Sequence, residues 1–356
     1  MNNNSQTCKN VNLTQIEMQK HLFEINKSLG LKAVLKYLYK WSLDVGYLTQ
    51  GKLNDNKRYE FFDKDLDITF KTQINIARSQ YSPKPLSGKN IPKLHCPICF
   101  ENIGIQGKED LRGYEFDLGL NRPFFIQLTP FPLYPKHFVL VDKKPTPMIM
   151  SEQSVRDLVT FIDLAPVYVG CSNSDVEWAG ASILTHHHYQ IFDNLHLPIM
   201  EASVIPNFSK NITRNKQIIT YSLLDYPIAT CLVECPQAEE FIKVCGEIIK
   251  NWKLAVPGKN TCNLVVKNNA EKNLYQAYII FRNPDFRTPE NLTHIKSEGV
   301  GIIEVAGEGI YPVPETQKIW DEIDNNGLKI IKGIIAGNNP VILDEYDQLF
   351  KIISTN

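Results

Sequence analysis

The segment that decides the fold is GASILTHHHYQIFD, which occupies residues 180–193. Its first part is apolar and runs into three consecutive histidines, although the whole chain of 356 residues contains only eight. We expect a strand here, on which neighbouring side chains alternate between two faces. His186, His188 and Gln190 should then share one face, and His187 should point to the other. Burying such a polar row without use would be costly, so the segment predicts a functional site.

The chemistry open to this row includes attack on phosphorus. A neutral imidazole is a good nucleophile, and its pKa of about 6.5 leaves most of it unprotonated at neutral pH. His188 could hold a phosphoryl group as a covalent phosphoramidate, and Gln190 could donate a hydrogen bond to a non-bridging oxygen. The small residues Gly180 and Ser182 would let backbone N–H groups approach a phosphate. Two other interpretations stay open: a metal site that uses His186 and His188, and a solvated histidine run.

A second signal is the segment HCPIC, which contains Cys96 and Cys99. A C-x-x-C pair presents two thiolates to one tetrahedral ion, and a complete site needs two more ligands. We expect these ligands from His95, His137, His186 or another residue. The pattern predicts a structural zinc ion, with a metal-free pair as the alternative.

Two isolated charged residues are further candidates. Arg78, in INIARSQ, could clamp a phosphate or stack on a base, and its alternative is an ordinary surface position. Glu304 lies in VGIIEVAG, which we expect to be an apolar strand. A carboxylate there needs partners, and sugar hydroxyls would serve, as would another polar group of the protein.

The chain as a whole reads as α+β. Helical spacing is expected over 12–41 with a break at Gly30, and over 151–170, 237–253 and 315–335. Strand patterns are expected over 59–76, 124–128, 137–141, 217–222, 227–234, 262–267, 274–281 and 301–305. A change of composition at 203–210 is the expected boundary. Each side of it mixes strands with one or two helices, which predicts two similarly built halves.

Composition excludes several classes of function. Lys and Arg number 38 against 39 Asp and Glu, so no basic field exists to bind a nucleic-acid backbone. No run of about 18 apolar residues predicts a transmembrane helix, and the start MNNNSQTCKN does not resemble a signal peptide. We therefore expect no membrane partner and a cytoplasmic protein with reduced cysteines. Cys231 and Cys235, in CLVEC, should face the core.

Several segments carry a resemblance to a known family. They are YKWSLDVGYLTQ with the later DLDITF, HCPICFENIGIQG, PFPLYPKHFVLV, VYVGCSNSDVEWAGASILTHHHYQ and HIKSEGVGIIEVAGEGIYP, spread in order over about residues 39–312. Together they resemble the histidine-triad superfamily, in the galactose-1-phosphate uridylyltransferase branch with its H-x-H-x-Q motif. The class II form, UDP-glucose–hexose-1-phosphate uridylyltransferase, is the most similar. The resemblance implies two histidine-triad-like halves, 58–205 for catalysis and 206–356, after an N-terminal helical lead-in over 1–57.

The resemblance also implies roles for individual residues. His188 matches the nucleophile that takes the nucleoside monophosphate, and Gln190 matches the residue that steadies the covalent intermediate. The backbone carbonyl of His186 would orient the His188 ring, and its side chain is a metal ligand in some relatives. Cys96 and Cys99 match their C-x-x-C metal pair.

The remaining positions that the resemblance assigns bind metal or substrate. His137 is the candidate for a further metal ligand. Asn173 and Ser182 lie where the phosphate and sugar are handled, and Glu304 falls where hexose hydroxyls are contacted.

The implied reaction moves a nucleoside monophosphate, UMP, between hexose 1-phosphates. The implied partners are therefore a nucleotide sugar and a sugar 1-phosphate, and a homodimer is left open. The same motif serves nucleotide-sugar and dinucleotide phosphorylases, which use orthophosphate as the acceptor. A non-catalytic relative that binds nucleotide or metal is the third alternative.

Overall fold

Two β-sheets form the body of the protein in a computed structural model that describes residues 12–49, 51, 54–76, 96–105, 108–119, 121–129, 131–180 and 183–354. The larger sheet has ten strands, and all of its neighbouring strands are antiparallel. In spatial order they are β3 (Gly113–Asp117), β4 (Pro123–Leu128), β5 (His137–Asp142), β7 (His188–Asp193), β6 (Tyr168–Ser172), β11 (Thr261–Asn269), β12 (Leu274–Arg282), β10 (Thr230–Cys235), β9 (Gln217–Leu224) and β8 (Val204–Arg214).

The order of these strands contains an internal symmetry. From one edge the first half runs β3-β4-β5-β7-β6, and from the other edge the second half runs β8-β9-β10-β12-β11. Each half also has one long helix between its third and fourth strand in the chain, α5 (Glu152–Leu164) and α6 (Ala238–Ala255). The expectation of two similarly built α+β halves is thus confirmed. They join through β6 and β11 into one continuous sheet.

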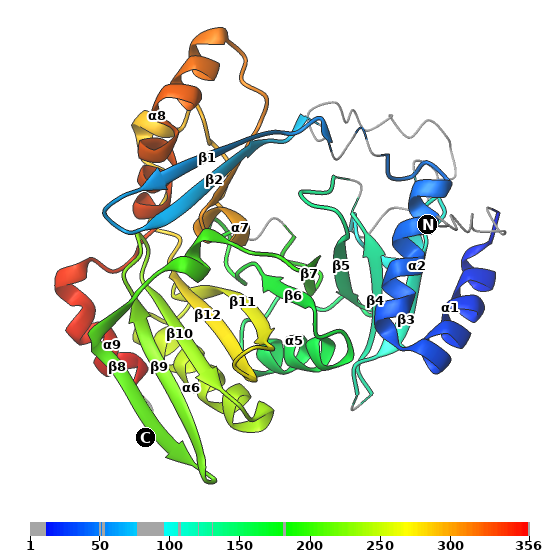
Figure 1. Cartoon of the computed structure of the whole chain (residues 1–356), viewed down its shortest axis with the longest axis horizontal. Coiled ribbons are helices and arrows are strands. Elements are labelled where there is room, and N and C mark those ends of the chain that lie inside the picture. Colours follow the sequence, from blue (N-terminus) through cyan, green and yellow to red (C-terminus); the bar gives the residue numbers. More distant parts are fainter. Residues whose placement is uncertain are drawn as a thin grey trace.

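The smaller sheet lies on one face of the larger one (Figure 1). It consists of β1 (Lys57–Asp63), β2 (Ile68–Ile74) and β13 (Glu308–Tyr311), and β13 runs parallel to β2. It therefore ties a segment near the start of the chain to one near its end. Helices α7 (Ile302–Val305) and α8 (Gln317–Gly337) accompany it, and their apolar side chains share a core with this face of the large sheet.

The opposite face of the large sheet is covered by α5 and α6, with α9 (Tyr346–Ile353) near one edge (Figure 1). Helices α1 (Gln15–Leu29) and α2 (Leu31–Asp44) lie near the other edge and belong to the same core. Short 3-10 turns are η1 (Phe100–Asn102), η2 (Pro198–Glu201), η3 (Glu290–Leu292) and η4 (Leu343–Glu345).

The helical lead-in protects an edge of the sheet. Thr14 and Glu17 form a capping box at the start of α1, and Gly30 separates α1 from α2 with φ +79°, as its position in the sequence predicts. The amide of Gln15 bonds both backbone groups of Gly113, and the amide of Gln19 bonds both backbone groups of Glu115, at 2.8–3.0 Å. These glutamines replace a missing strand beside β3, which would otherwise expose unpaired groups.

Some expected elements are wrong in type or extent. The segment 301–305 is not a strand, because α7 covers most of it. The helix expected over 151–170 ends at Leu164, and β6 follows. The strand expected within 180–193 begins only at His188.

Other features of the fold agree with the sequence or leave its predictions open. Cys231 and Cys235 are fully buried in the core, as expected. The division at 57/58 and 205/206 stays a prediction, and β8 runs across the second boundary. No helix among the described residues is long and apolar enough to cross a membrane.

Candidate active site and metal cluster

His188 is the first residue of β7, a central strand of the large sheet. It pairs with Val141 of β5, and the alternation along β7 places Gln190 on its side of the sheet. His187 and Tyr189 lie on the other side, where the Tyr189 hydroxyl contacts Asp157 of α5. The predicted opposition of His187 and His188 therefore agrees with the structure. His186, in contrast, precedes the strand.

The imidazole of His188 is oriented by the backbone of its own segment. Its Nδ1 lies 2.8 Å from the carbonyl oxygen of His186. Because a carbonyl only accepts, Nδ1 carries the proton and donates it, and Nε2 keeps a free electron pair. The side chain is buried at 8% exposure. Burial lowers the pKa of His188, although the bond to the His186 carbonyl opposes this, so the ring is neutral at pH 7.

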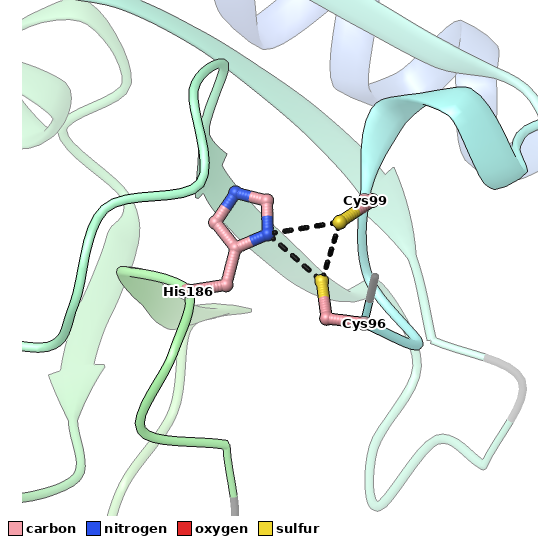
Figure 2. Close-up of side chains that lie close together, drawn as sticks. All are labelled: Cys96, Cys99 and His186. Carbon is pink, nitrogen blue, oxygen red and sulfur yellow. Dashed lines mark hydrogen bonds between the residues drawn. The ribbon is translucent and has the colours of Figure 1, made fainter. Parts of the chain in front are cut away.

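The side chain of His186 completes a cluster with the two cysteines of the C-x-x-C pair (Figure 2). Its Nδ1 lies 2.9 Å from the Cys96 sulfur and 3.5 Å from the Cys99 sulfur. The two sulfurs are 2.6 Å apart and are free thiols. Both cysteines and His186 are buried. His186 thus meets Cys99 and Cys96, which precede it by 87 and 90 residues, in one candidate metal site.

The chemistry of this donor set fits a metal ion. His186 Nε2 lies 2.8 Å from the backbone oxygen of Asp142, so it donates its proton there and presents the Nδ1 electron pair to the cysteines. Two sulfurs and one imidazole nitrogen are ligands that zinc prefers. Without a cation the Cys99 thiol holds its proton, since burial and the neighbouring Cys96 raise the pKa of Cys99 to about 12. Metal binding would therefore release protons.

His137 does not belong to this cluster, which corrects its assignment as a metal ligand. It pairs with Phe192, whereas Val141 pairs with His188, so it lies four residues, about 13 Å, further along the strands. Its Nδ1 accepts from the backbone N–H of Leu133 at 3.3 Å, and its ring stacks on Phe192. Burial lowers the pKa of His137 to about 3, although the side chain of Gln190 opposes this. His137 is a neutral core residue beneath Gln190.

Three polar residues come to the same end of neighbouring strands. β6 pairs with β7 on one side and with β11 on the other, and its register brings Asn173 close to the level of His188 and Asn263. The side-chain oxygen of Asn173 accepts from the backbone N–H of Ile302 in α7 at 2.9 Å. A Cβ on Gly180 would lie 2.8 Å from Val300 O, so only glycine fits at this φ of +103°. Asn173 and Gly180 thus meet the segment that begins α7.

Glu304 also belongs to this assembly, but it already has partners in the protein. One carboxylate oxygen accepts from the backbone N–H of Gly301 at 2.6 Å, which caps α7. The other lies 2.8 Å from the Lys296 ammonium, and both side chains are almost fully buried. In the structure Glu304 therefore links Lys296 to the start of α7.

Arg282 is a buried charge beneath the same segment that no sequence pattern indicated. It donates to Val300 O and to Asn338 Oδ1 at 3.0 Å each, and to Asn263 Oδ1. Burial lowers the pKa of Arg282 to about 10, and Glu304 opposes this, so the guanidinium stays charged. The sequence could not reveal Arg282, because only the fold brings its partners Asn263, Val300 and Asn338 together. Arg78, Ser182 and His95 lie outside the described residues.

Comparison with known proteins adds names to this geometry. No protein-family model matches the chain. Several curated proteins that match it are called galactose-1-phosphate uridylyltransferase. The one from Caldanaerobacter subterraneus subsp. tengcongensis is 25% identical over 373 aligned residues, which cover 93% of this chain and 67% of that protein. The chain is thus similar, over most of its length, to proteins called galactose-1-phosphate uridylyltransferase. That from Clostridium acetobutylicum is 26% identical over 79% of this chain and 61% of its own. That from Lactobacillus helveticus is 26% identical over 88% and 71%.

This chain spans about two thirds of the length of these uridylyltransferases. Among solved structures, that of yeast Ap4A phosphorylase matches it with a TM-score of 0.55 at 12% sequence identity, over 87% of this chain and 97% of that one. The same yeast protein in complex with AMP gives a TM-score of 0.53. At such low identity the likeness concerns the fold, and it confirms the histidine-triad-like architecture.

The ion pair between Glu304 and Lys296 yields a prediction about stability. Glu304→Ala leaves the buried ammonium without its close partner, so we expect the free energy of unfolding to fall by about 3 kcal/mol. Glu298→Ala is the matched control, because Glu298 lies 3.9 Å from the same ammonium and is 60% exposed. It should change stability by less than about 1 kcal/mol. Urea unfolding measures both, and equal losses would contradict the assignment.

Proposed function

We propose that the chain transfers UMP between hexose 1-phosphates through a covalent uridylyl group on His188. The observation that carries the proposal is the bond from His188 Nδ1 to the His186 carbonyl. It fixes the tautomer in which Nε2 has the free electron pair, in a ring that burial keeps neutral. Such a nitrogen is the nucleophile that phosphoryl chemistry needs.

The reaction proceeds in two displacements at the same phosphorus. The Nε2 electron pair of His188 forms a bond to the α-phosphorus of a nucleotide sugar, and the bond from that phosphorus to the bridging oxygen breaks. The sugar 1-phosphate leaves with the electron pair of the broken phosphorus–oxygen bond. A second sugar 1-phosphate then attacks the uridylyl group, and His188 recovers its electron pair. Because a sugar phosphate is a good leaving group, no strong general acid is required, and Gln190 donates to a non-bridging oxygen.

The substrate pocket would draw on both halves of the sheet. Asn173 and Gly180 come from the first half, and the segment from Val300 to Glu304 comes from the second. Glu304 is the proposed contact for hexose hydroxyls through the electron pairs that its two protein partners leave free. Arg78 and Ser182 are proposed to contact phosphate.

The Cys96, Cys99 and His186 cluster is proposed to hold zinc in a structural role. Zinc, when bound, would fix the thiolates and the His186 ring and thereby the segment that leads into β7. His188 is not a member of the cluster, and its Nδ1 is already bonded to a carbonyl. The ion therefore supports the position of the nucleophile and is not expected to contact the reacting phosphorus.

Removal of the nucleophile is the direct test of this function. With UDP-glucose and galactose 1-phosphate, His188→Ala should lower kcat by roughly 10⁴-fold or more, as loss of a covalent nucleophile does. It should also abolish the mass gain of one uridylyl group on incubation with UDP-glucose. His187→Ala is the matched control on the opposite face and should retain the mass gain with a milder loss of kcat. Equal, complete losses in both variants, measured by steady-state kinetics and mass spectrometry, would refute the assignment.

The metal proposal predicts separate effects of two cysteine substitutions. Cys96→Ser should lower the zinc content and the melting temperature, because zinc binding contributes directly to folding. Cys262→Ser is the control, since Cys262 is a buried thiol of β11 that is not part of the cluster. It should keep the zinc content of the unaltered protein. Elemental analysis that finds almost no zinc in protein purified without chelator would contradict the proposal.

A phosphorylase is the second candidate, favoured by the structural likeness to yeast Ap4A phosphorylase. Both reactions share the covalent intermediate and differ in what discharges it. We expect galactose 1-phosphate to discharge the uridylylated protein faster than orthophosphate at equal concentration. Glu304→Gln should slow the first discharge by roughly 10-fold or more, equivalent to about 1–3 kcal/mol, and leave the second nearly unchanged. Rapid-quench kinetics measure both, and faster discharge by orthophosphate would replace the transferase with a phosphorylase.

A further inference from the structure

The two residues that flank the nucleophile form a buried hydrogen-bonded chain on the far face of β7. His187 Nε2 lies 2.6 Å from the Tyr189 hydroxyl, and that hydroxyl donates to Asp157 of α5 at 2.9 Å. Asp157 also accepts from Arg122 at 2.9 Å and from Gln153 at 2.8 Å. None of these groups belongs to the proposed active site, yet the series of hydrogen bonds begins at His187, the residue next to His188.

The donor and the acceptor can be assigned for each hydrogen bond in this series. Asp157 is paired with Arg122, so its carboxylate accepts and the Tyr189 hydroxyl donates to it. The phenol oxygen is then left to accept from His187 Nε2–H. His187 Nδ1 in turn lies 3.4 Å from the backbone nitrogen of Ile149. Because the backbone N–H is a donor, Nδ1 accepts this hydrogen bond. The charged pair thus fixes the tautomer and rotation of the His187 ring.

The backbone of His187 is held as firmly as its ring. Its N–H donates to the carbonyl of Thr146 at 2.7 Å, and its carbonyl accepts from the N–H of Asp142 at 3.0 Å. The N–H of His187 and the carbonyl of His186 belong to the same peptide group. Because that group is planar and trans, its N–H and C=O point in opposite directions. Fixing His187 therefore fixes the direction of the His186 carbonyl, which is the acceptor for His188 Nδ1.

We propose that Tyr189 is a positioning residue for the nucleophile. Through His187 it holds the peptide plane between His186 and His187, and this plane aims the His188 ring from the opposite face of the sheet. The inference rests on the proposed function for its kinetic consequences only. A buried phenol without use would cost more than a phenylalanine of the same shape, because its hydroxyl must be desolvated and paired.

The test removes the hydroxyl and keeps the ring. Tyr189→Phe should lower kcat for uridylyl transfer from UDP-glucose about 10-fold, slow formation of the covalent intermediate by a similar factor, and leave both KM values within twofold. Zinc content should not change, which separates this effect from damage to the cysteine cluster. The matched control is Tyr168→Phe. Tyr168 is a buried tyrosine of the neighbouring strand β6, and it packs near Phe161 of α5, the helix that also carries Asp157. The control variant should keep the kcat of the unaltered protein.

A second readout does not depend on activity. In protein with ¹⁵N-labelled histidine, long-range ¹H–¹⁵N correlation spectra report which ring nitrogen carries the proton. The unaltered protein and Tyr168→Phe should show His188 as one tautomer, protonated at Nδ1. Tyr189→Phe should show a mixture of tautomers or exchange broadening. This measurement stands even if the protein does not use UDP-glucose, so failure of the proposed function and failure of the positioning role can be told apart.

Three results would overturn the proposal. The first is an unchanged kcat and a single His188 tautomer in Tyr189→Phe. The second is a lower kcat with a single His188 tautomer retained, since the loss of kcat would then not be caused by a change in the orientation of the His188 ring. The third is an equal loss in Tyr168→Phe, which would indicate general core destabilisation. If Tyr189→Phe does not fold, Asp157→Asn takes its place, with the same direction of change expected at about threefold in kcat.

Discussion

The carbonyl of His186 is the constraint on which the rest of the site depends. It accepts a hydrogen bond from His188 Nδ1. The ring of His186 itself lies against the sulfurs of Cys96 and Cys99. His186 therefore belongs to the candidate metal cluster through its side chain and orients His188, the proposed nucleophile, through its backbone. Asp142 links the two from β5, since its backbone oxygen accepts from His186 and its N–H bonds His187. Movement of the cluster would therefore rotate the ring of His188, the proposed nucleophile.

The symmetry of the sheet allows the two halves to be compared at the position of the proposed nucleophile. β12 occupies in the second half the place of β7 in the first, but its sequence, LYQAYIIFR, contains no histidine. The second half instead supplies the segment around α7, which Arg282 and Asn173 hold from below. That segment contacts Asn173, which lies close to the level of His188 on the neighbouring strand of the continuous ten-stranded sheet. In the proposed function, the first half thus provides the nucleophile His188, and the second half provides the segment around α7 that faces the substrate.

Local patterns predicted the parts of the site that depend on local geometry. The alternation of strands placed His187 opposite His188, and the close spacing of Cys96 and Cys99 placed them together. Long-range register could not be read in the same way. His137 is four residues too far along β5 to join the cluster, and this depends on which residue faces which across two strands. The apolar segment around Glu304 fits a strand or a short helix equally well, and the Gly301 cap decides for the helix.

His187, between the proposed metal ligand His186 and the proposed nucleophile His188, shows why a polar residue can be retained at a position that faces the core. Its place in the row suggested only that it points away from the chemistry. In the structure that direction leads to Tyr189, Asp157 and Arg122, so the far face of the strand is polar as well. An apolar face there would bind β7 to α5 by packing, which resists rotation of a single peptide group weakly because it is not directional. Hydrogen bonds are directional, and the proposed role of His188, which must meet phosphorus along one line, depends on direction more than on burial.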